Sequence, residues 1–104
     1  MRTMCCLRST ASGTRAVVYR SGRCQGIVGV VDFLTDAVPR ADRGWEADGV
    51  FRPVEPHLPR AELLADPDLR PVFAHLQSRR RLPGLARSRL GALLPDLPRL
   101  GTAR

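Results

Sequence analysis

The side chains of this chain that could do chemistry lie between Tyr19 and Asp32. Ser21 and Cys24 are nucleophile types, but neither has a histidine nearby in sequence to serve as its base. Asp32 stands among apolar residues, where a carboxylate more often pairs with an arginine or caps a loop than acts in catalysis. The chain also lacks Gly-x-Ser-x-Gly, phosphate-loop and dinucleotide-binding patterns. We therefore predict no catalytic residue and a protein that is not an enzyme.

The cysteines and histidines do not have the spacing of a metal site. An odd count of three cysteines without a secretion signal argues against a disulfide framework. Cys5 and Cys6 are adjacent, whereas zinc ligand pairs usually leave a few residues between them. His57 and His75 are far apart. We predict no metal ligand and no cofactor.

Arginine dominates the charge of the chain. All 17 basic residues are arginine, and the net charge is +7. The planar guanidinium binds phosphate oxygens in pairs, so this composition favours nucleic acid as a partner. The densest cluster, Arg79–Arg81, is predicted to contact phosphates. Two alternatives stay open: GC-rich coding gives arginine without lysine whatever the function, and the cluster would also suit a solvated turn.

Two aromatic side chains are candidates for stacking on a base, Tyr19 and Trp45. Tyr19 ends an apolar stretch beside Arg20 and Ser21, where a binding pocket could form. Trp45 alternates with Phe51 on one face of an expected strand, which favours packing in the core.

Alternating and β-branched residues predict three strands, at residues 16–20, 26–35 and 45–54. The loop between the first two is short and contains glycine, which predicts an antiparallel hairpin. Gly29 inside the second strand indicates a bulge or a close backbone approach. Pro53 is expected to limit the third strand.

Three proline-punctuated helical segments follow the strands. The first runs over residues 59–64, and the second begins at Asp66-Pro67. Apolar residues at helical spacing define the second and third segments: Leu69, Val72, Phe73 and Leu76, then Ala86, Leu90, Leu93, Leu94 and Leu97. Strands followed by short helices predict an α+β fold, and 104 residues suffice for one small domain.

Neither end of the chain shows a structural period. Residues 1–12 mix polar residues and cysteines without alternation, so we predict a poorly structured segment, and residues 99–104 are expected to fray. No apolar run reaches the length of a membrane-spanning helix or of a signal peptide. We expect no membrane partner and a cytoplasmic protein.

The central residues resemble a known family. Residues 13–21, Gly-Thr-Arg-Ala-Val-Val-Tyr-Arg-Ser, followed by Gly26-Ile27-Val28-Gly29, are similar to the central block of EVE domains. Arg52-Pro53-Val54 and the helix entry from Leu58 to Asp66-Pro67 continue the similarity, which covers residues 13–98. The resemblance implies a PUA-like small β-barrel with short helices in its C-terminal half. Such modules are associated with RNA or with modified DNA bases, held as a flipped base in a pocket.

The same resemblance implies which residues would hold the ligand. Tyr19, Arg20 and Ser21 would form part of the pocket wall, and Gly26, Ile27, Val28 and Gly29 would bring backbone close to it. The chain departs from the family at Thr14 and Arg20, where EVE domains have Asp and His. EVE domains also begin with a strand and a helix that together carry a Trp and help to close the pocket, and residues 1–12 show neither element. The chain would then be a shortened member with an incomplete barrel and an open sheet edge.

The leading hypothesis is a non-enzymatic nucleic-acid-binding module that recognises a modified base in DNA or RNA. The alternative is a protein-interaction subunit, or a truncated family member without binding activity of its own, which would dock on a partner chain or on itself through the open edge. A small enzyme that uses Cys24 or Asp32 is the third hypothesis.

Overall fold

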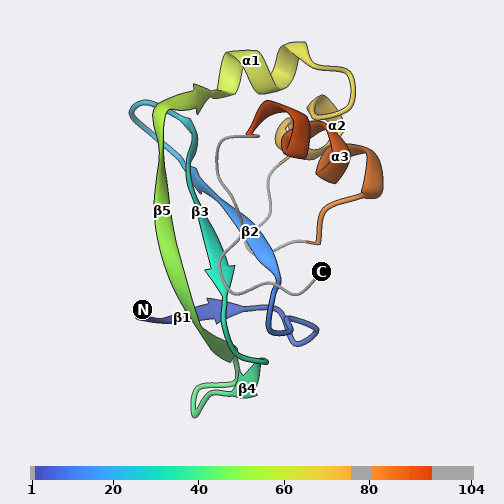
Figure 1. Ribbon diagram of the computed structural model, residues 1–104. Helices are drawn as coiled ribbons and strands as arrows, with labels where there is room; N and C mark the ends of the chain where they lie inside the picture. Colours follow the sequence, from blue (N-terminus) through green and yellow to red (C-terminus); the bar gives the residue numbers. More distant parts are fainter. Residues whose placement is uncertain (1, 76–80, 95–104) are drawn as a thin grey trace.

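A computed structural model describes residues 2–75 and 81–94, which form a small α+β domain (Figure 1). In these residues five strands make one antiparallel sheet in the order β1-β5-β3-β2, with β4 paired to β5. The strands are β1 (Arg2–Cys6), β2 (Arg15–Arg20), β3 (Gly26–Phe33), β4 (Val38–Pro39) and β5 (Trp45–Pro59). The helices are α1 (Arg60–Ala65), α2 (Arg70–Phe73) and α3 (Gly84–Leu93). The predicted α+β class is confirmed, and the sheet is not closed into a barrel.

The predicted hairpin is confirmed as β2 and β3, which pair antiparallel from Arg15↔Asp32 to Arg20↔Gly26. The bulge expected near Gly29 is present: the register of β3 shifts between Ile27 and Gly29 on the β5 side, and that of β2 shifts after Val18. Val28 therefore has no partner in either neighbouring strand. On the β5 side most of the extra residues lie in β5, because residues 54–57 separate the pair Gly29↔Pro53 from the pair Ile27↔Leu58.

The prediction that residues 1–12 are poorly structured is wrong for Arg2–Cys6, which form β1. This strand pairs antiparallel with the start of β5, with Met4 opposite Ala47. Thr3 Oγ1 also donates a hydrogen bond to Asp48 Oδ1 at 2.9 Å. Met4 and Cys6 pack inward, but two apolar positions are too few to give a strand signal in the sequence. The partner strand, whose paired residues lie 39 to 47 positions away, decides the conformation.

The strand β5 is longer than predicted, because it continues past Pro53 to Pro59. The carbonyl of Asp48 accepts a hydrogen bond from the Leu34 amide, so residues 48, 50 and 52 turn their backbone groups toward β3. Residues 49, 51 and 53 then face the outer edge, where β1 pairs only as far as Gly49. No strand pairs with Pro53 on that outer edge, so the missing N–H of the proline costs no hydrogen bond. The strand can therefore continue through it.

The helices follow the predicted order with shifted boundaries. The helix α1 begins after Pro59, close to the prediction. The segment after Asp66 forms a turn first, in which the Asp66 carboxylate accepts a hydrogen bond from the Asp68 amide, and α2 begins only at Arg70. The third apolar stripe lies on α3, where Ala86 and Leu90 are buried. Leu76 and Leu97 lie outside the described residues. None of the described helices is long and apolar enough to cross a membrane.

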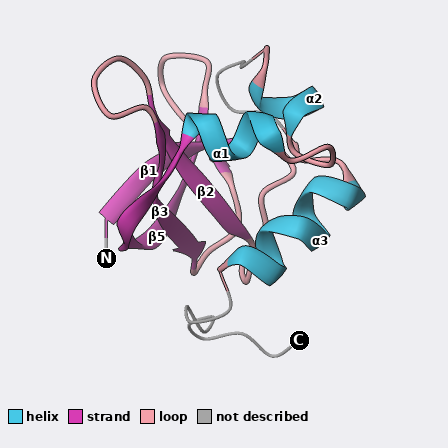
Figure 2. Ribbon diagram, turned by 90° about the horizontal axis from the view of Figure 1, so that it is seen from above, coloured by secondary structure: helices cyan, strands magenta, loops and turns pink. Residues whose placement is uncertain are grey.

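Each face of the sheet carries a core of its own. The face that we call the helix side packs against α1–α3, as the view from above shows (Figure 2). Its buried residues are Ile27, Leu63, Leu69, Val72, Phe73, Ala86 and Leu90. The opposite face, the β1 side, holds a smaller cluster of Cys6, Val31, Phe33 and Ala47. Strand alternation in β2 supplies both: Val17 and Tyr19 pack on the helix side, Ala16 and Val18 on the β1 side.

Candidate nucleic-acid interface

The predicted pocket residue Tyr19 is engaged within the fold. Its ring stacks on Phe73, with centroids 5.8 Å apart and an interplanar angle of 26°. Arg60 Nη1 donates a hydrogen bond to the Tyr19 hydroxyl at 3.2 Å and another to the Phe73 carbonyl at 2.7 Å. The hydroxyl in turn donates to Gln25 Oε1 at 3.4 Å. Tyr19 thus connects β2 to α1 and α2, and its ring belongs to the helix-side core.

Trp45 lies far from Tyr19 in the fold. It begins β5, whereas Tyr19 lies beside Ile27, which pairs with Leu58 near the other end of β5. The indole packs against the β1-side core, as its shared face with Phe51 predicted, and the Arg8 guanidinium lies 5.4 Å from the ring centroid. The structure therefore does not bring the two predicted aromatic residues together around one ligand.

The predicted segment Gly26–Gly29 holds β3 against β5. Gly26 is buried with φ +151°, and a Cβ there would lie well inside van der Waals contact with the Leu58 carbonyl. Ile27 is fully buried in the helix-side core, and Val28 is partly exposed. The backbone of this segment was predicted to lie close to a ligand. In the structure it lies close to the backbone of β5.

The loop that follows β2 is exposed throughout, from Arg20 to Gln25. It lies next to α1, because the Arg60 amide donates a hydrogen bond to the Gln25 carbonyl at 2.9 Å. The side chains of Arg20 and Arg23 make no hydrogen bond or ion pair with any residue that the structure describes. Two unneutralised guanidinium groups therefore flank the exposed Ser21 at one end of the sheet. We call Arg20–Gln25 the basic loop.

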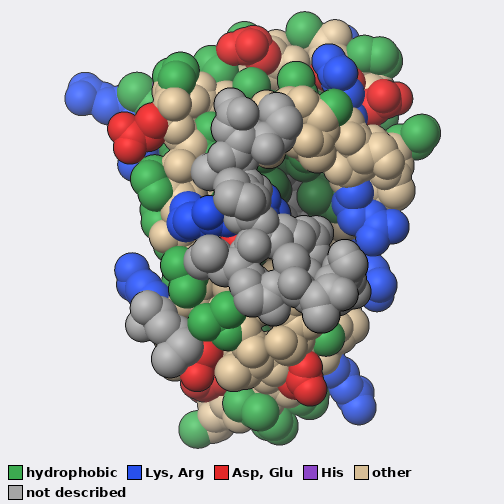
Figure 3. Space-filling view, in the orientation of Figure 1, with side chains coloured by type: hydrophobic (Ala, Val, Ile, Leu, Met, Phe, Trp, Pro, Cys, Tyr) green, Lys and Arg blue, Asp and Glu red, His purple; other side chains and the backbone are tan. Residues whose placement is uncertain are grey.

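The remaining predicted phosphate contacts are only partly within the described residues. Arg81 is exposed just before α3, and Arg79 and Arg80 lie outside the described residues. Further arginines are distributed over several parts of the molecular surface (Figure 3). The basic loop is distinguished by two arginines three residues apart in the sequence, neither of which forms an ion pair with a residue that the structure describes.

Phe51 is an aromatic residue whose surface position the sequence did not reveal. It lies on the β1 side, where its ring edge packs over the backbone of Gly29, so that a Cβ at position 29 would collide with the ring. The residue is nevertheless 40% exposed. The strand β1 pairs with β5 only from Trp45 to Gly49, so it does not flank Phe51 along the outer edge of β5. The one available signal was Gly29 itself, since a glycine inside a strand leaves a hollow for a neighbouring ring.

Asp32 is paired with arginine, as expected. It is 3% exposed, and Arg15 binds it with two hydrogen bonds, Nε to Oδ1 at 2.6 Å and Nη2 to Oδ2 at 2.9 Å. Arg52 Nη2 donates to the same Oδ2 at 2.9 Å. The three residues come from β2, β3 and β5 on the helix side of the sheet. This carboxylate joins three strands, which is a structural role.

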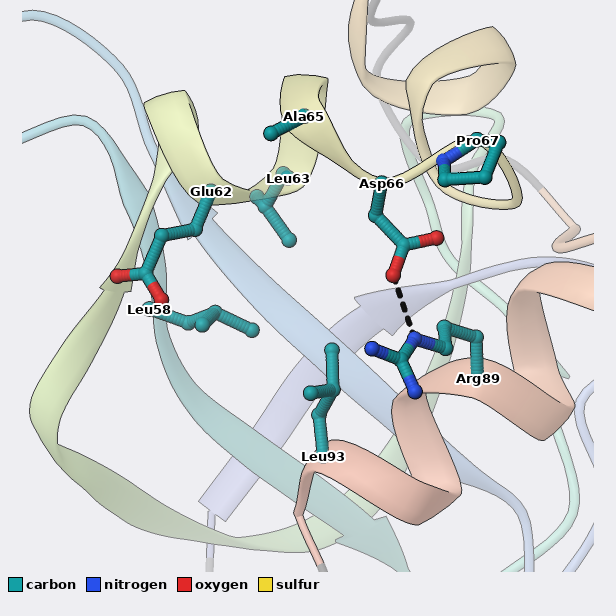
Figure 4. A pocket seen from close by; sticks show the side chains of 8 residues that line it. All are labelled: Leu58, Glu62, Leu63, Ala65, Asp66, Pro67, Arg89 and Leu93. Atoms are coloured by element: carbon teal, nitrogen blue, oxygen red, sulfur yellow. Dashed lines mark hydrogen bonds and ion pairs between the residues drawn. The ribbon is translucent and has the colours of Figure 1, made fainter.

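The described residues form a pocket of about 380 Å³ between α1 and α3 (Figure 4). It contains none of the predicted site residues; Leu58, Glu62, Leu63, Ala65, Asp66, Pro67, Arg89 and Leu93 line it. At its edge Arg89 Nε donates to Asp66 Oδ2 at 2.5 Å, and this hydrogen bond lowers the pKa of the Asp66 carboxyl. The ion pair ties the start of the α2 turn to α3.

Asp66→Asn is expected to destabilise the protein near neutral pH, and the difference from wild type is expected to vanish in acid. Because the folded pKa lies below the ordinary value of 3.8, the ion pair contributes in full above that value. Its contribution is lost as the pH falls through the lower, folded pKa. Urea unfolding at about pH 7, about pH 5 and about pH 3 measures the effect. A difference that is unchanged across this range would contradict a role for the charge.

The three cysteines are free thiols, and in residues 2–75 and 81–94 no three His, Cys, Asp or Glu side chains gather as a metal site would require. Cys5 Sγ contacts the Arg40 guanidinium on the outer surface of β1. The pKa of Arg40 is raised, first by Asp42 and then by Cys5. These contacts hold the β4–β5 turn against β1.

Comparisons of the chain with protein-family models, curated proteins and solved structures give no match. Any inference about the function of this chain therefore rests on its own residues and their geometry.

Proposed function

We propose that this protein is a non-enzymatic nucleic-acid-binding module, related to the PUA-like EVE domains, that grips phosphates with its basic loop. The observation that carries the proposal is the pair Arg20 and Arg23, both exposed and without a partner among the described residues. Holding two like charges near each other without a carboxylate suits a surface that meets an anion. The net charge of +7 acts in the same direction by attracting polyanions from a distance.

The resemblance to EVE domains supports a narrower form of the proposal, in which a modified base is recognised. That form needs a pocket for the base, and Tyr19 and Trp45 lie too far apart to form its walls together. Phosphate contacts alone give binding that does not depend on sequence or modification. A comparison of modified and unmodified oligonucleotides separates the two forms.

Replacing both Arg20 and Arg23 with alanine is expected to weaken oligonucleotide binding and to reduce its salt dependence. Each phosphate contact contributes about 0.7–0.9 to the slope of log affinity against log salt concentration, so loss of two should reduce the slope by about 1.5. Fluorescence anisotropy with a labelled oligonucleotide between about 50 mM and about 200 mM salt measures both quantities. Arg87→Ala is the matched control, because Arg87 is exposed on α3 and lies away from the loop.

Wild-type protein that binds neither single-stranded nor duplex oligonucleotides at low salt would overturn the proposal. That result would favour the protein-interaction hypothesis, and light scattering would then test for self-association. An equal loss of slope in Arg87→Ala would show that net charge, and not the basic loop, makes the contact.

A further inference from the structure

The part of the β1 side that β1 leaves uncovered carries an aromatic ring and a cation. From this arrangement we infer that the ligand is a single-stranded nucleic acid, one base of which stacks on Phe51 while Arg20 holds a neighbouring phosphate. This inference rests on the proposed function and specifies its substrate class. The four residues that build the surface are Val18, Arg20, Gly29 and Phe51, which we call the Phe51 platform.

Gly29 leaves room for the outer edge of the Phe51 ring to lie against the sheet. The nearest atoms to a Cβ at position 29 would be Cε1 and Cζ of this ring, so the ring lies across the space that any other residue would fill. Pairing places Val18 on the β2 side of Gly29 and Pro53 on the β5 side. With 40% of the residue still exposed, the platform offers an aromatic surface to solvent beside the stretch of β5 that β1 does not pair with.

Arg20 is placed on the same face by strand alternation. Val17 and Tyr19 contact the helix-side core and Val18 contacts the β1-side core, so the next residue, Arg20, projects on the β1 side. It stands two residues, about 7 Å, beyond Val18 along β2. A cation on the same face of the sheet as an exposed aromatic ring is the combination with which proteins hold a backbone phosphate by charge and a base by stacking.

The shape of the platform selects a single strand. Bases in a duplex are stacked on one another, and a side chain reaches between them only as a protruding wedge. The outermost ring atoms of Phe51 lie against Gly29 on the neighbouring strand, so the side chain runs across the sheet and does not stand out as a wedge. We therefore expect it to stack only on a base that is already free. The other two candidate rings are engaged, Tyr19 with Phe73 and Trp45 with Arg8, which leaves one base position on the platform.

The test compares three labelled probes of equal length: a single-stranded oligonucleotide, its duplex, and a strand with the same phosphates but no bases. Wild type is expected to bind the single strand best. Phe51→Leu keeps an apolar side chain over Gly29 and is expected to weaken single-strand binding about 10-fold, to the level of the abasic probe. Phe51→Trp should restore it, with the added indole fluorescence quenched on binding. Leu85→Ala, a 71% exposed apolar residue on α3, is the control.

The salt slope separates this inference from the proposed function. Loss of stacking should leave the slope of Phe51→Leu equal to that of wild type, because the phosphate contacts remain. Wild type that binds the abasic probe or the duplex as tightly as the single strand would overturn the stacking inference and leave phosphate binding in place. Unchanged affinity in Phe51→Leu, with thermal unfolding like wild type, would do the same. Absence of binding to all three probes would overturn both.

Discussion

Asp32→Ala is expected to cost about 3–5 kcal/mol of unfolding free energy, the largest effect of any charge removal in the described structure. The carboxylate is 3% exposed and receives hydrogen bonds from Arg15 and Arg52, whose side chains are only 15% and 22% exposed. Without it, two partly buried guanidinium groups face each other across β3 with their shared counter-charge removed. Repulsion and lost hydrogen bonds then act together on β2, β3 and β5.

Equilibrium urea unfolding followed by circular dichroism measures this effect, with Asp42→Ala as the matched control. Asp42 also pairs with an arginine, Arg40, but its side chain is 66% exposed, so its removal should cost less than about 1 kcal/mol. If the two variants were equally stable, the carboxylate of Asp32 would not be joining the three strands.

Gly26→Ala is expected to be the most damaging single-methyl addition. Its φ of +151° is a conformation that residues with a side chain rarely adopt, which costs about 1–3 kcal/mol. The new Cβ would also collide with the Leu58 carbonyl and lie 2.9 Å from Pro59 Cα, and such overpacking costs about 1–3 kcal/mol more. Since both obstacles are backbone atoms, relief requires β3 and β5 to separate where the chain enters α1.

Thermal unfolding of Gly26→Ala beside Gly22→Ala isolates the collision. Gly22 also has a positive φ, +80°, but nothing lies within 4 Å of an added Cβ. We expect Gly22→Ala to cost about 1–2 kcal/mol for its backbone conformation alone. A melting temperature for Gly26→Ala as high as that of Gly22→Ala would mean that the β3–β5 approach is looser than described.

The sequence predicted the elements whose signals are local. The hairpin of β2 and β3 follows from β-branched residues and a glycine-containing loop, and both strands were located within two residues of their ends. The strand β1 was missed because its conformation depends on β5, whose pairing with Arg2 begins at Gly49. Pro53 misled the prediction for β5, since the sequence does not show which edge of a strand lacks a neighbour.

The candidate site was predictable in residue type more than in arrangement. The arginine pairing of Asp32 followed from a carboxylate in an apolar strand, but its partners Arg15 and Arg52 depend on strand order. Alternation predicted which face of the sheet carries Phe51. It did not predict that Phe51 is exposed, because the sequence does not show that β1 stops pairing at Gly49. Tyr19 and Trp45 were grouped because both are aromatic. The length of β5 separates them, since Trp45 begins this strand and Tyr19 lies near its other end.

The proline in β5 has a consequence for how the protein behaves at high concentration. An open sheet offers its bare edge as a template on which identical strands can add, the first step of cross-β growth. Beyond Gly49 the outer edge of β5 presents the amide of Phe51 and then Pro53, which has none to present. A strand that added to this edge could accept a hydrogen bond from the Phe51 amide but none from Pro53, so the ladder of hydrogen bonds would be interrupted there. The stretch of β5 that β1 leaves unpaired is thus a poor template for fibril formation.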